Sequence, residues 1–283
     1  MKTMHLFAGV GGGLLADLIL GHEPIVAVEW DAYCCQVLRE RAADGWFRGL
    51  RVHEGDIRLF DPSDYTGRVD CIHAGFPCQD VSVAGNRAGL GDDTRSGLYR
   101  EVLRIAGIVR PHFLFLENVT AILSGGLGTI LGDLAARGYD ARWTCLPASA
   151  TGAPHYRDRW WCLAERTDAE CVQSSERRGF EEVRGRSAEA KQARLVGGYV
   201  ADTLRDGLQG LRNPISGNGT AGASARGEAS RGASEEGGDW WAIEPGLDRV
   251  VDGIPNRAHR IKALGNAQVP LQAAVAWRLL GGP

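Results

Sequence analysis

Short apolar stretches of strand length alternate with amphipathic stretches over the first 165 residues of the chain. Apolar residues recur at helical spacing in the amphipathic stretches, so the pattern is typical of βαβ units built around a mostly parallel sheet. Strands are expected near residues 4–7, 25–29, 51–54, 69–73, 113–117, 141–146 and 160–164, and helices near 13–20, 32–42, 96–109 and 122–136.

This pattern fails after residue 166, where Ser, Gly, Glu and Arg dominate and residues 213–238 are close to low complexity. Regular patterning returns at Trp240, and residues 269–280 predict an amphipathic helix that closes the chain. We expect this helix to pack back onto the sheet, with Asn266 at the junction. The chain is therefore predicted to have three parts: an α/β domain of residues 1–165, a small variable lobe of 166–245, and a C-terminal segment of 246–283.

The composition is that of an ordinary soluble globular protein, with 44% hydrophobic residues, 24% charged residues and a net charge of -3. No apolar run approaches the ~20 residues of a membrane span, and no leader peptide is expected at the N-terminus. The seven cysteines are odd in number and lack Cys-x-x-Cys spacing. This argues against a disulfide framework or a zinc site, so no metal is expected and the reducing cytoplasm is the natural setting.

A glycine-rich turn, Phe7-Ala8-Gly9-Val10-Gly11-Gly12-Gly13, follows the first predicted strand. Leu14 stands where a dinucleotide fingerprint needs its third glycine, and no Gly-Lys-Ser/Thr of a P-loop follows. Glu29 ends the next strand, 20 residues after Gly9, where an acidic side chain accepts ribose hydroxyls. Taken alone, the loop is equally a tight strand–helix turn. Combined with Glu29 and Asp56, it favours an adenosine ligand without phosphates, such as S-adenosylmethionine, with Asp56 on the adenine amino group and Trp30 stacked on the ring.

Cys78 occupies a position that is hard to explain structurally. It stands in Gly75-Phe76-Pro77-Cys78-Gln79, between a predicted strand and a Gly- and Asp-rich stretch of residues 86–96. A thiol there lies at the carboxyl edge of the sheet, where open α/β sheets place their chemistry. The alternative, a small buried hydrophobic side chain, suits Cys71 inside the strand far better.

Two further groups are expected at the same edge of the sheet. Glu117 ends the apolar strand 113–117, and a carboxylate there is costly to desolvate unless it is paired or functional, although a helix cap or a structural acid is the alternative. Arg157 and Arg159 precede another predicted strand, and residues two apart on an extended segment share a face. They are suited to binding an anion or a base oxygen, but arginines are also common on surfaces.

Taken together, these residues resemble the DNA (cytosine-5) methyltransferases of bacterial and phage type. The motifs occur in family order and cover about residues 1–165 and 240–283. Three positions depart from the family pattern: His5 replaces the usual Asp of the first motif, His155 replaces Gln before the paired arginines, and Gln268 is inserted into what is often Asn-Ala-Val-Pro. The matching segments are Leu6 to Gly12, Glu29, Gly55-Asp56-Ile57, Gly75 to Gln79, Glu117-Asn118-Val119, Arg157-x-Arg159 and Gly265 to Pro270.

The resemblance implies a Rossmann-like S-adenosylmethionine-dependent methyltransferase with a mostly parallel central sheet, which leaves S-adenosylhomocysteine as product. Cys78 would add to C6 of a flipped-out cytosine, Glu117 would hold the N3/N4 edge, and Arg157 would hold O2. Residues 86–95, flanked by Gly85 and Gly97, would close over the base. The resemblance also implies a catalytic set of Cys78, Glu117, Arg157 and Arg159, cofactor contacts from Phe7, Ala8, Gly9, Gly11, Gly12, Glu29, Trp30, Asp56, Ile57, Pro77, Leu98, Asn266 and Ala267, and substrate contacts from Gln79, Ser82, Asn118 and Val119.

The expected partner is double-stranded DNA, read by a target-recognition region at residues 166–245. Arginines 177, 178, 184, 186 and 194 of that region are candidates for phosphate or guanine contacts, and a solvated linker is the alternative. A monomer in the cytoplasm, associated with the nucleoid through DNA, is expected, with a cognate restriction endonuclease as a possible companion. Two other functions stay open: a tRNA cytosine-5 methyltransferase and a catalytically inactive DNA-binding homologue. A nicotinamide dehydrogenase is disfavoured by Leu14 and by the lack of a second nucleotide-binding half.

Overall fold

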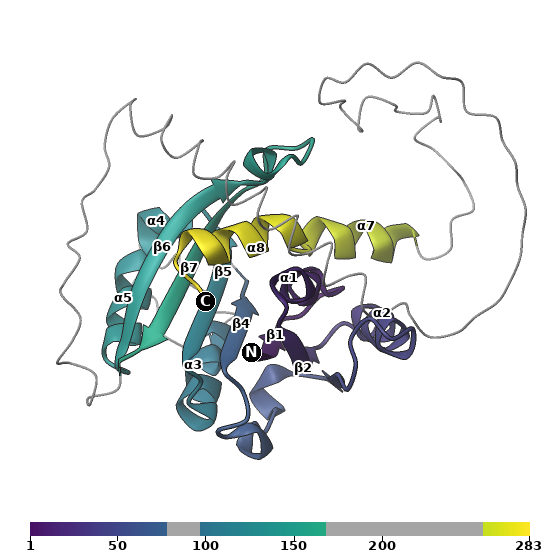
Figure 1. The fold of residues 1–283 in the computed structure, drawn as a ribbon, viewed down its shortest axis with the longest axis horizontal. Helices are drawn as coiled ribbons and strands as arrows, with labels where there is room; N and C mark the ends of the chain where they lie inside the picture. The colour runs from purple at the N-terminus through teal and green to yellow at the C-terminus, as the bar shows by residue number, and fades with distance from the viewer. Residues whose placement is uncertain (78–96, 168–256) are drawn as a thin grey trace, which may run out of the picture.

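The computed structural model describes residues 1–77, 97–167 and 257–283 (Figure 1). Within these residues the strands are β1 (Lys2–Leu6), β2 (Glu23–Glu29), β3 (Arg51–Glu54), β4 (Cys71–Gly75), β5 (Phe113–Val119), β6 (Tyr139–Pro147) and β7 (Asp158–Arg166). The α-helices are α1 (Gly12–Leu20), α2 (Ala32–Ala43), α3 (Gly97–Val109), α4 (Ile122–Gly125), α5 (Leu127–Ala135), α7 (Arg257–Asn266) and α8 (Pro270–Leu279). Short 3₁₀ turns are η1 (Ile57–Leu59), η2 (Ser63–Tyr65) and η4 (Ala148–Thr151).

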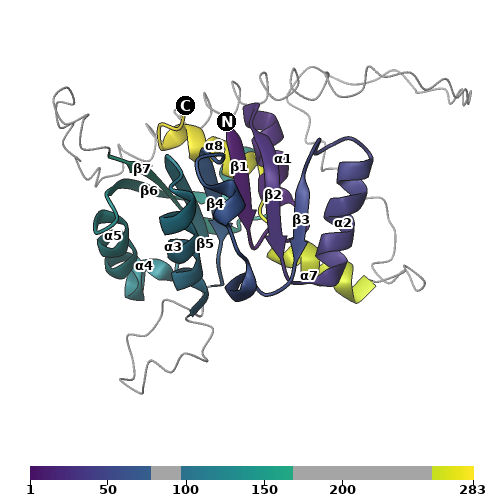
Figure 2. The same cartoon turned by 90° about the horizontal axis from the view of Figure 1, so that it is seen from below.

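The seven described strands form one sheet in the order β3-β2-β1-β4-β5-β7-β6. Pairing is parallel from β3 to β5, and β7 runs antiparallel to both of its neighbours. Helices lie on both sides of the sheet, as the view from below shows (Figure 2). The predicted α/β class with a mostly parallel sheet is confirmed.

Alternate residues of the central strands enter two separate cores, as the pleat of a sheet requires. Leu114 and Leu116 of β5 belong to the core beneath α3 and α5. Phe113 and Phe115 belong to the core beneath α8, where both ring centroids lie within 5.6 Å of Trp277. The C-terminal helix α8 therefore packs back onto the sheet, as the sequence predicted.

Most predicted elements agree with the structure, two differ, and one observed helix was not predicted. The expected strand at 69–73 begins two residues later, at Cys71. The expected helix at 122–136 is broken at Gly126 into α4 and α5, which follows from the low helix propensity of consecutive glycines. Helix α7 was not predicted, because its apolar residues Ile261 and Leu264 are exposed and do not form a buried stripe.

Several predicted features lie outside the described residues. These are the target-recognition region apart from residues 166 and 167, the loop at 86–95, and Cys78, Gln79 and Ser82. No helix in the described parts of the chain is long and apolar enough to cross a membrane.

Candidate active site

A cavity of about 380 Å³ opens at the carboxyl ends of the parallel strands. The chain reverses its direction of progress across the sheet between the neighbouring strands β1 and β4, and ligands of open α/β sheets bind at such a switch point. Segments from both ends of the chain form its wall. The lining includes Phe7 and Gly9 after β1, residues 29–31 after β2, residues 75–77 at the end of β4, residues 117–119 of β5, Arg157 and Arg159 near β7, and Lys262, Ala263, Gly265 and Asn266 of α7.

Glu29 ties the loop after β1 to the end of β2. Its Oε2 accepts a hydrogen bond from the Gly9 N–H at 2.7 Å, and its Oε1 accepts from the N–H groups of Trp30 and Asp31 at 2.9 Å each. Phe7 and Gly9 both have positive φ, 58° and 54°, so the loop is held in a conformation that is sparsely populated for Phe7. A carboxylate accepts about four hydrogen bonds, which leaves about one position on Glu29 for a ligand.

Two residues after Glu29 complete this side of the cavity. The Trp30 side chain is 75% exposed, although large aromatic groups are usually covered. Asp31 caps α2 through the N–H groups of Tyr33 and Cys34, and its other oxygen lies 3.1 Å from Nζ of Lys262. This ion pair joins α2 to α7 across the cavity wall.

Two side chains hold the carboxyl group of Glu117. Its side chain is only 13% exposed, and Oε1 lies 3.0 Å from Nε of Arg159. Oε2 accepts a hydrogen bond from Nε2 of Gln268 at 3.3 Å. Burial raises the pKa of Glu117, although Gln268, Arg159 and Arg157 act in the opposite direction. The site therefore favours the protonated acid more than water does.

The two predicted arginines have different contacts. Arg157 donates to the backbone carbonyls of Gly265 at 2.9 Å and Ala267 at 2.6 Å, and thereby holds the segment between α7 and α8. Arg159 faces Glu117 instead. Both line the larger cavity, as predicted, but Arg157 precedes β7 and has a φ of 30°, so the alternation of the strand does not extend to it.

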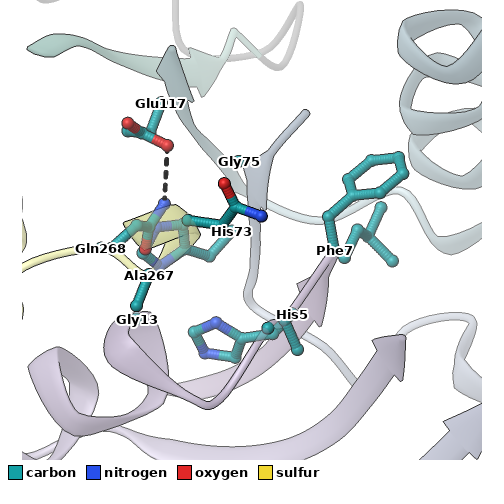
Figure 3. Close-up of a pocket in the computed structure, with 12 residues that line it drawn as sticks. His5, Phe7, Gly13, His73, Gly75, Glu117, Ala267 and Gln268 are labelled. Carbon is teal, nitrogen blue, oxygen red and sulfur yellow. Dashed lines mark hydrogen bonds between the residues drawn. The ribbon is translucent and has the colours of Figure 1, made fainter. Parts of the chain in front are cut away.

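A second, smaller cavity of about 30 Å³ lies beside Glu117 (Figure 3). Gln268 and Glu117 line it together with His5, His73, Gly13 and Gly75, among others. A Cβ built on Gly75 would lie 2.9 Å from both Nε2 of Gln268 and Oε2 of Glu117, and a Cβ on Gly12 would overlap the carbonyl oxygen of Gln268. The glycines thus leave the space that residue 268 fills.

This close approach predicts a cost for any side chain at residue 12. We expect Gly12→Ala to lower the free energy of unfolding by about 1–3 kcal/mol, the range typical of overpacking. The matched variant Gly128→Ala, in helix α5 with no atom within 4 Å of the new Cβ, is expected to be neutral or stabilising by up to ~1 kcal/mol. Urea denaturation of both variants checks this, and equal effects would contradict it.

The structure brings together many, but not all, of the predicted site residues. Among the described cofactor candidates, Gly11, Gly12, Asp56, Ile57 and Leu98 line neither cavity. Asp56 caps η1 and forms an ion pair with Arg58 at 2.5 Å. The candidates that line at least one cavity are Phe7, Ala8, Gly9, Glu29, Trp30, Pro77, Glu117, Asn118, Val119, Arg157, Arg159, Asn266 and Ala267.

Other cavity-lining residues were not among the predicted site residues, including Asp31, Lys262, His73 and Gln268. Asp31 carried a usable signal, since an Asp directly before a predicted helix is a typical cap and stands beside Glu29. The position of Gln268 had a weaker signal, its departure from the family pattern. His73 had none, because a histidine inside an apolar strand reads as a core residue.

None of the five described cysteines is suited to attack a substrate, because the thiolate is the nucleophile. Burial raises the pKa of Cys34 and Cys162 to about 12 and that of Cys35 and Cys145 to about 11, and it raises the pKa of Cys71 well above its usual value. Pro77 lines the larger cavity, and Cys78 follows it in the sequence.

The sheet order and the site at its switch point define a Rossmann-like α/β fold. A solved structure of a Spodoptera frugiperda DNMT2 variant matches this fold with a TM-score of 0.50 and 20% identity, covering 64% of this chain and 53% of that one. The family model of the C-5 cytosine-specific DNA methylases matches residues 1–226. The chain belongs to this family.

Individual relatives match about 60% of the chain. The type II methyltransferase M.CviJI of Paramecium bursaria Chlorella virus IL3A is 34% identical over 172 residues, which is 60% of this chain and 44% of the relative. M.HhaI of Haemophilus parahaemolyticus is 30% identical over 172 residues, 59% of this chain and 50% of the relative. The chain thus spans about half the length of the curated relatives it matches.

Proposed function

We propose that the protein transfers a methyl group from S-adenosylmethionine to C5 of a cytosine in double-stranded DNA. The observation that carries this proposal is the position of Glu117. It is a buried acid with a raised pKa, it contacts Arg159, and it lines the same cavity as Glu29 and Trp30. An acid beside an arginine suits the polar edge of a base, and the part of the cavity lined by Glu29 and Trp30 suits an adenosine.

The residues of the larger cavity fit S-adenosylmethionine. Its volume of about 380 Å³ is within the range typical of small-molecule sites. Glu29 retains capacity for a ribose hydroxyl, and the exposed Trp30 indole offers a face for the adenine ring. Among the described lining residues, Lys262 is paired with Asp31, Arg159 with Glu117, and Arg157 with two backbone carbonyls, so a ligand without phosphates is favoured. When bound, S-adenosylmethionine supplies an electrophilic methyl group.

The protein's own groups would activate the cytosine. C5 of cytosine is a poor nucleophile, and addition of the Cys78 thiolate to C6 makes the ring an enamine that attacks through C5. Glu117 would donate its proton towards N3 and so offset the negative charge that builds up in the ring during addition. After transfer, loss of the C5 proton and departure of the thiolate restore the aromatic ring. Cys78 lies outside the described residues, so its role rests on the sequence motif.

We assign the contact with O2 of the base to Arg159 rather than Arg157. Both terminal nitrogens of Arg157 are occupied by carbonyl groups of Gly265 and Ala267, whereas Arg159 lies against Glu117. A guanidinium and an acid held side by side match the adjacent O2 and N3 of cytosine. Arg157 then serves to fix the segment that carries Asn266 and Gln268.

Recognition of DNA would fall to residues 166–245, with residues 1–165 and 246–283 forming the catalytic body. The target base must leave the duplex stack to reach a cavity at the edge of the sheet, so the proposal includes base flipping. Arginines of the variable region would then contact phosphates and guanines.

Bisulfite sequencing tests the proposal directly. Plasmid DNA from cells that express the protein is expected to contain 5-methylcytosine in one short sequence context. The same cells supply tRNA for the same treatment, and methylation of tRNA alone would replace DNA by RNA as the substrate. Unmodified DNA and RNA, from cells that contain folded protein, would overturn the proposal.

We expect Glu29→Ala to weaken the binding of S-adenosylmethionine by about 1–3 kcal/mol, the cost of unpaired polar groups. The substitution also removes the acceptor for the Gly9 N–H, so the loop after β1 loses its anchor. Calorimetric titration of the variant checks this. Glu23→Ala, at the exposed start of the same strand, is the control and is expected to bind normally. Unchanged affinity of Glu29→Ala would refute the assignment.

A further inference from the structure

Gln268 lies between the buried acid of the site and two buried histidines (Figure 3). Its Nε2 donates to Oε2 of Glu117 at 3.3 Å. The other end of the carboxamide lies beside Gly13, where a Cβ would be 2.7 Å from Oε1 of Gln268, 2.8 Å from Cε1 of His73 and 3.1 Å from Nδ1 of His5. One glycine is thus surrounded by all three side chains.

Glycines from two elements leave room for residue 268. Gly12 and Gly13 open helix α1, and Gly75 ends β4. A Cβ at any of them would come within 2.9 Å of a backbone or side-chain atom of Gln268. Protein interiors are close-packed, so three such gaps around one residue, one at its backbone and two at its side chain, mean that the space is shaped for it.

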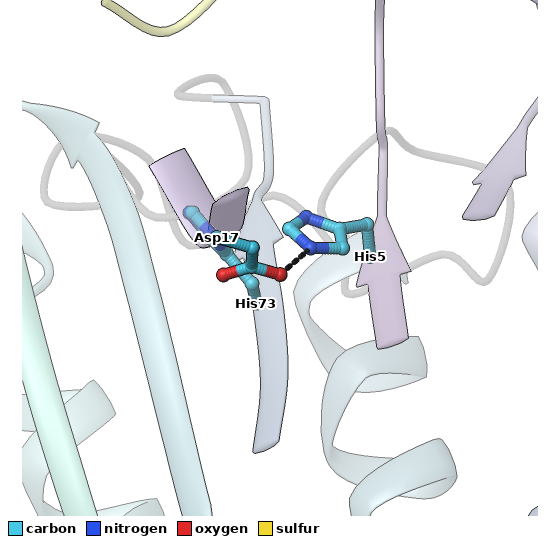
Figure 4. A group of neighbouring side chains, drawn as sticks. All are labelled: His5, Asp17 and His73. Carbon is cyan, nitrogen blue, oxygen red and sulfur yellow. Dashed lines mark hydrogen bonds and ion pairs between the residues drawn. The ribbon is translucent and has the colours of Figure 1, made fainter. Parts of the chain in front are cut away.

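His5, which lines the smaller cavity together with Gln268, is also hydrogen-bonded to Asp17 (Figure 4). Nε2 of His5 lies 2.6 Å from Oδ2 of Asp17, and Thr3 donates to the same oxygen. Two atoms bound to one tetrahedral metal ion would be about 3.4 Å apart, so this spacing is that of a direct hydrogen bond. Burial disfavours the charge of Asp17, but His5 and His22 outweigh it and hold the pKa of Asp17 well below its usual range. His5 and Asp17 are therefore already paired with each other.

His73 adds no charge next to Gln268. Burial and, after it, the neighbouring His5 lower the pKa of His73 to about 3, so its imidazole is neutral at physiological pH. The cations that face Glu117 are Arg159 and Arg157, from β7 and the segment before it. Gln268, which lies beside the two histidines, is the hydrogen-bond donor to Oε2 of Glu117.

We propose that Gln268 is a positioning residue that fixes the orientation of the Glu117 carboxyl group for the reaction. Arg159 holds Oε1 and Gln268 holds Oε2, so the two contacts together define the plane of the carboxyl. The terminal torsion of a Glu side chain is otherwise broad, and a small misplacement of a reacting group is costly. The expected effect on the reaction rests on the proposed function, whereas the expected effect on the pKa of Glu117 does not.

The first test measures the acid itself. Glu residues are labelled with ¹³C at the carboxyl carbon, and the signal of Glu117 is identified by its loss in Glu117→Gln. Because Gln268 donates to the ionised form, Gln268→Met is expected to raise the pKa of Glu117. Gln268→Glu places a second acid there and is expected to raise it further, which keeps the test informative if one variant does not fold.

The second test measures the reaction. In single-turnover transfer of labelled methyl groups, Gln268→Met is expected to lower the rate about 10- to 100-fold while the affinity for S-adenosylmethionine stays within about twofold. The decline of the rate at high pH is expected to move upwards with the pKa of Glu117. A merely structural role would lower the amount of active protein without moving the pH profile.

Gln36→Met is the matched control. On the exposed face of α2, Gln36 donates to Glu40 at 2.8 Å, so the same substitution removes the same kind of hydrogen bond far from the site. It is expected to change neither rate nor pKa. A Glu117 pKa that is the same in wild type and both Gln268 variants overturns the inference. Failure of the wild-type protein to methylate DNA or RNA would instead overturn the proposed function, and the titration still decides the role of Gln268.

Discussion

Replacing Cys78 with serine is expected to lower methyl transfer by on the order of 10⁴-fold or more, the scale seen when an attacking nucleophile is lost. A serine hydroxyl is far less acidic than a thiol, so it supplies no comparable anion to add to C6 of cytosine. Binding of S-adenosylmethionine is expected to remain within about twofold, because the glycine turn and Glu29 are on other segments. Single-turnover transfer of labelled methyl groups and calorimetric titration provide the two measurements.

Cys145→Ser is the control for this substitution. Cys145 lies on β6 and lines neither cavity, and burial raises the pKa of its thiol to about 11. This variant is expected to transfer methyl groups at the normal rate. Near-normal activity of Cys78→Ser, or equal losses in the two variants, would remove Cys78 from the mechanism.

Hydrophobic periodicity was sufficient to predict the sheet and most of its helices, since it reports which side chains face a core. The strand 51–54 was predicted at its observed bounds. Glu29 and Glu117 were also predicted near one another, because parallel strands bring their carboxyl ends to the same edge. The break at Gly126 and the exposed helix α7 were not predicted, because neither changes the spacing of buried apolar residues along the sequence.

The partners of the site residues could not be predicted in this way. Arg157 and Arg159 are equivalent in the sequence, and a positive φ at Arg157 separates them by sending one to the backbone of residues 265 and 267 and the other to Glu117. Gln268 meets Glu117 across 151 residues. Such contacts depend on how distant segments pack, and no local pattern records them.

Glu117→Gln is expected to lower the rate of methyl transfer about 10²- to 10³-fold, the usual loss for a group that stabilises developing charge. The amide keeps the size of the side chain but has no acidic proton to give to N3. Arg159 and Gln268 both donate to oxygens of Glu117, and the amide offers one oxygen and one NH₂ group in their place. One of the two contacts is therefore lost. Single-turnover assays at saturating S-adenosylmethionine isolate this step from cofactor binding.

The matched control is Glu165→Gln. At the far end of β7, Glu165 pairs with Arg142 at 3.1 Å, so the substitution breaks another acid–arginine pair on the same strand. Exposed pairs of this kind contribute about 0–1 kcal/mol to stability. The variant is therefore expected to be slightly less stable and fully active. A comparable loss of rate in both variants would trace the effect of Glu117→Gln to folding.

The pH dependence separates a proton donor at Glu117 from a group that only binds the base. Burial raises the pKa of Glu117, so the protonated form extends to higher pH than for an ordinary Glu. The wild-type rate is expected to fall as the pH rises through this pKa, because the donated proton is then absent. In Glu117→Gln the amide does not titrate, so this decline is expected to vanish while the rise due to thiolate formation at Cys78 remains. A decline that persists unchanged in Glu117→Gln would assign it to another group and leave Glu117 with binding alone.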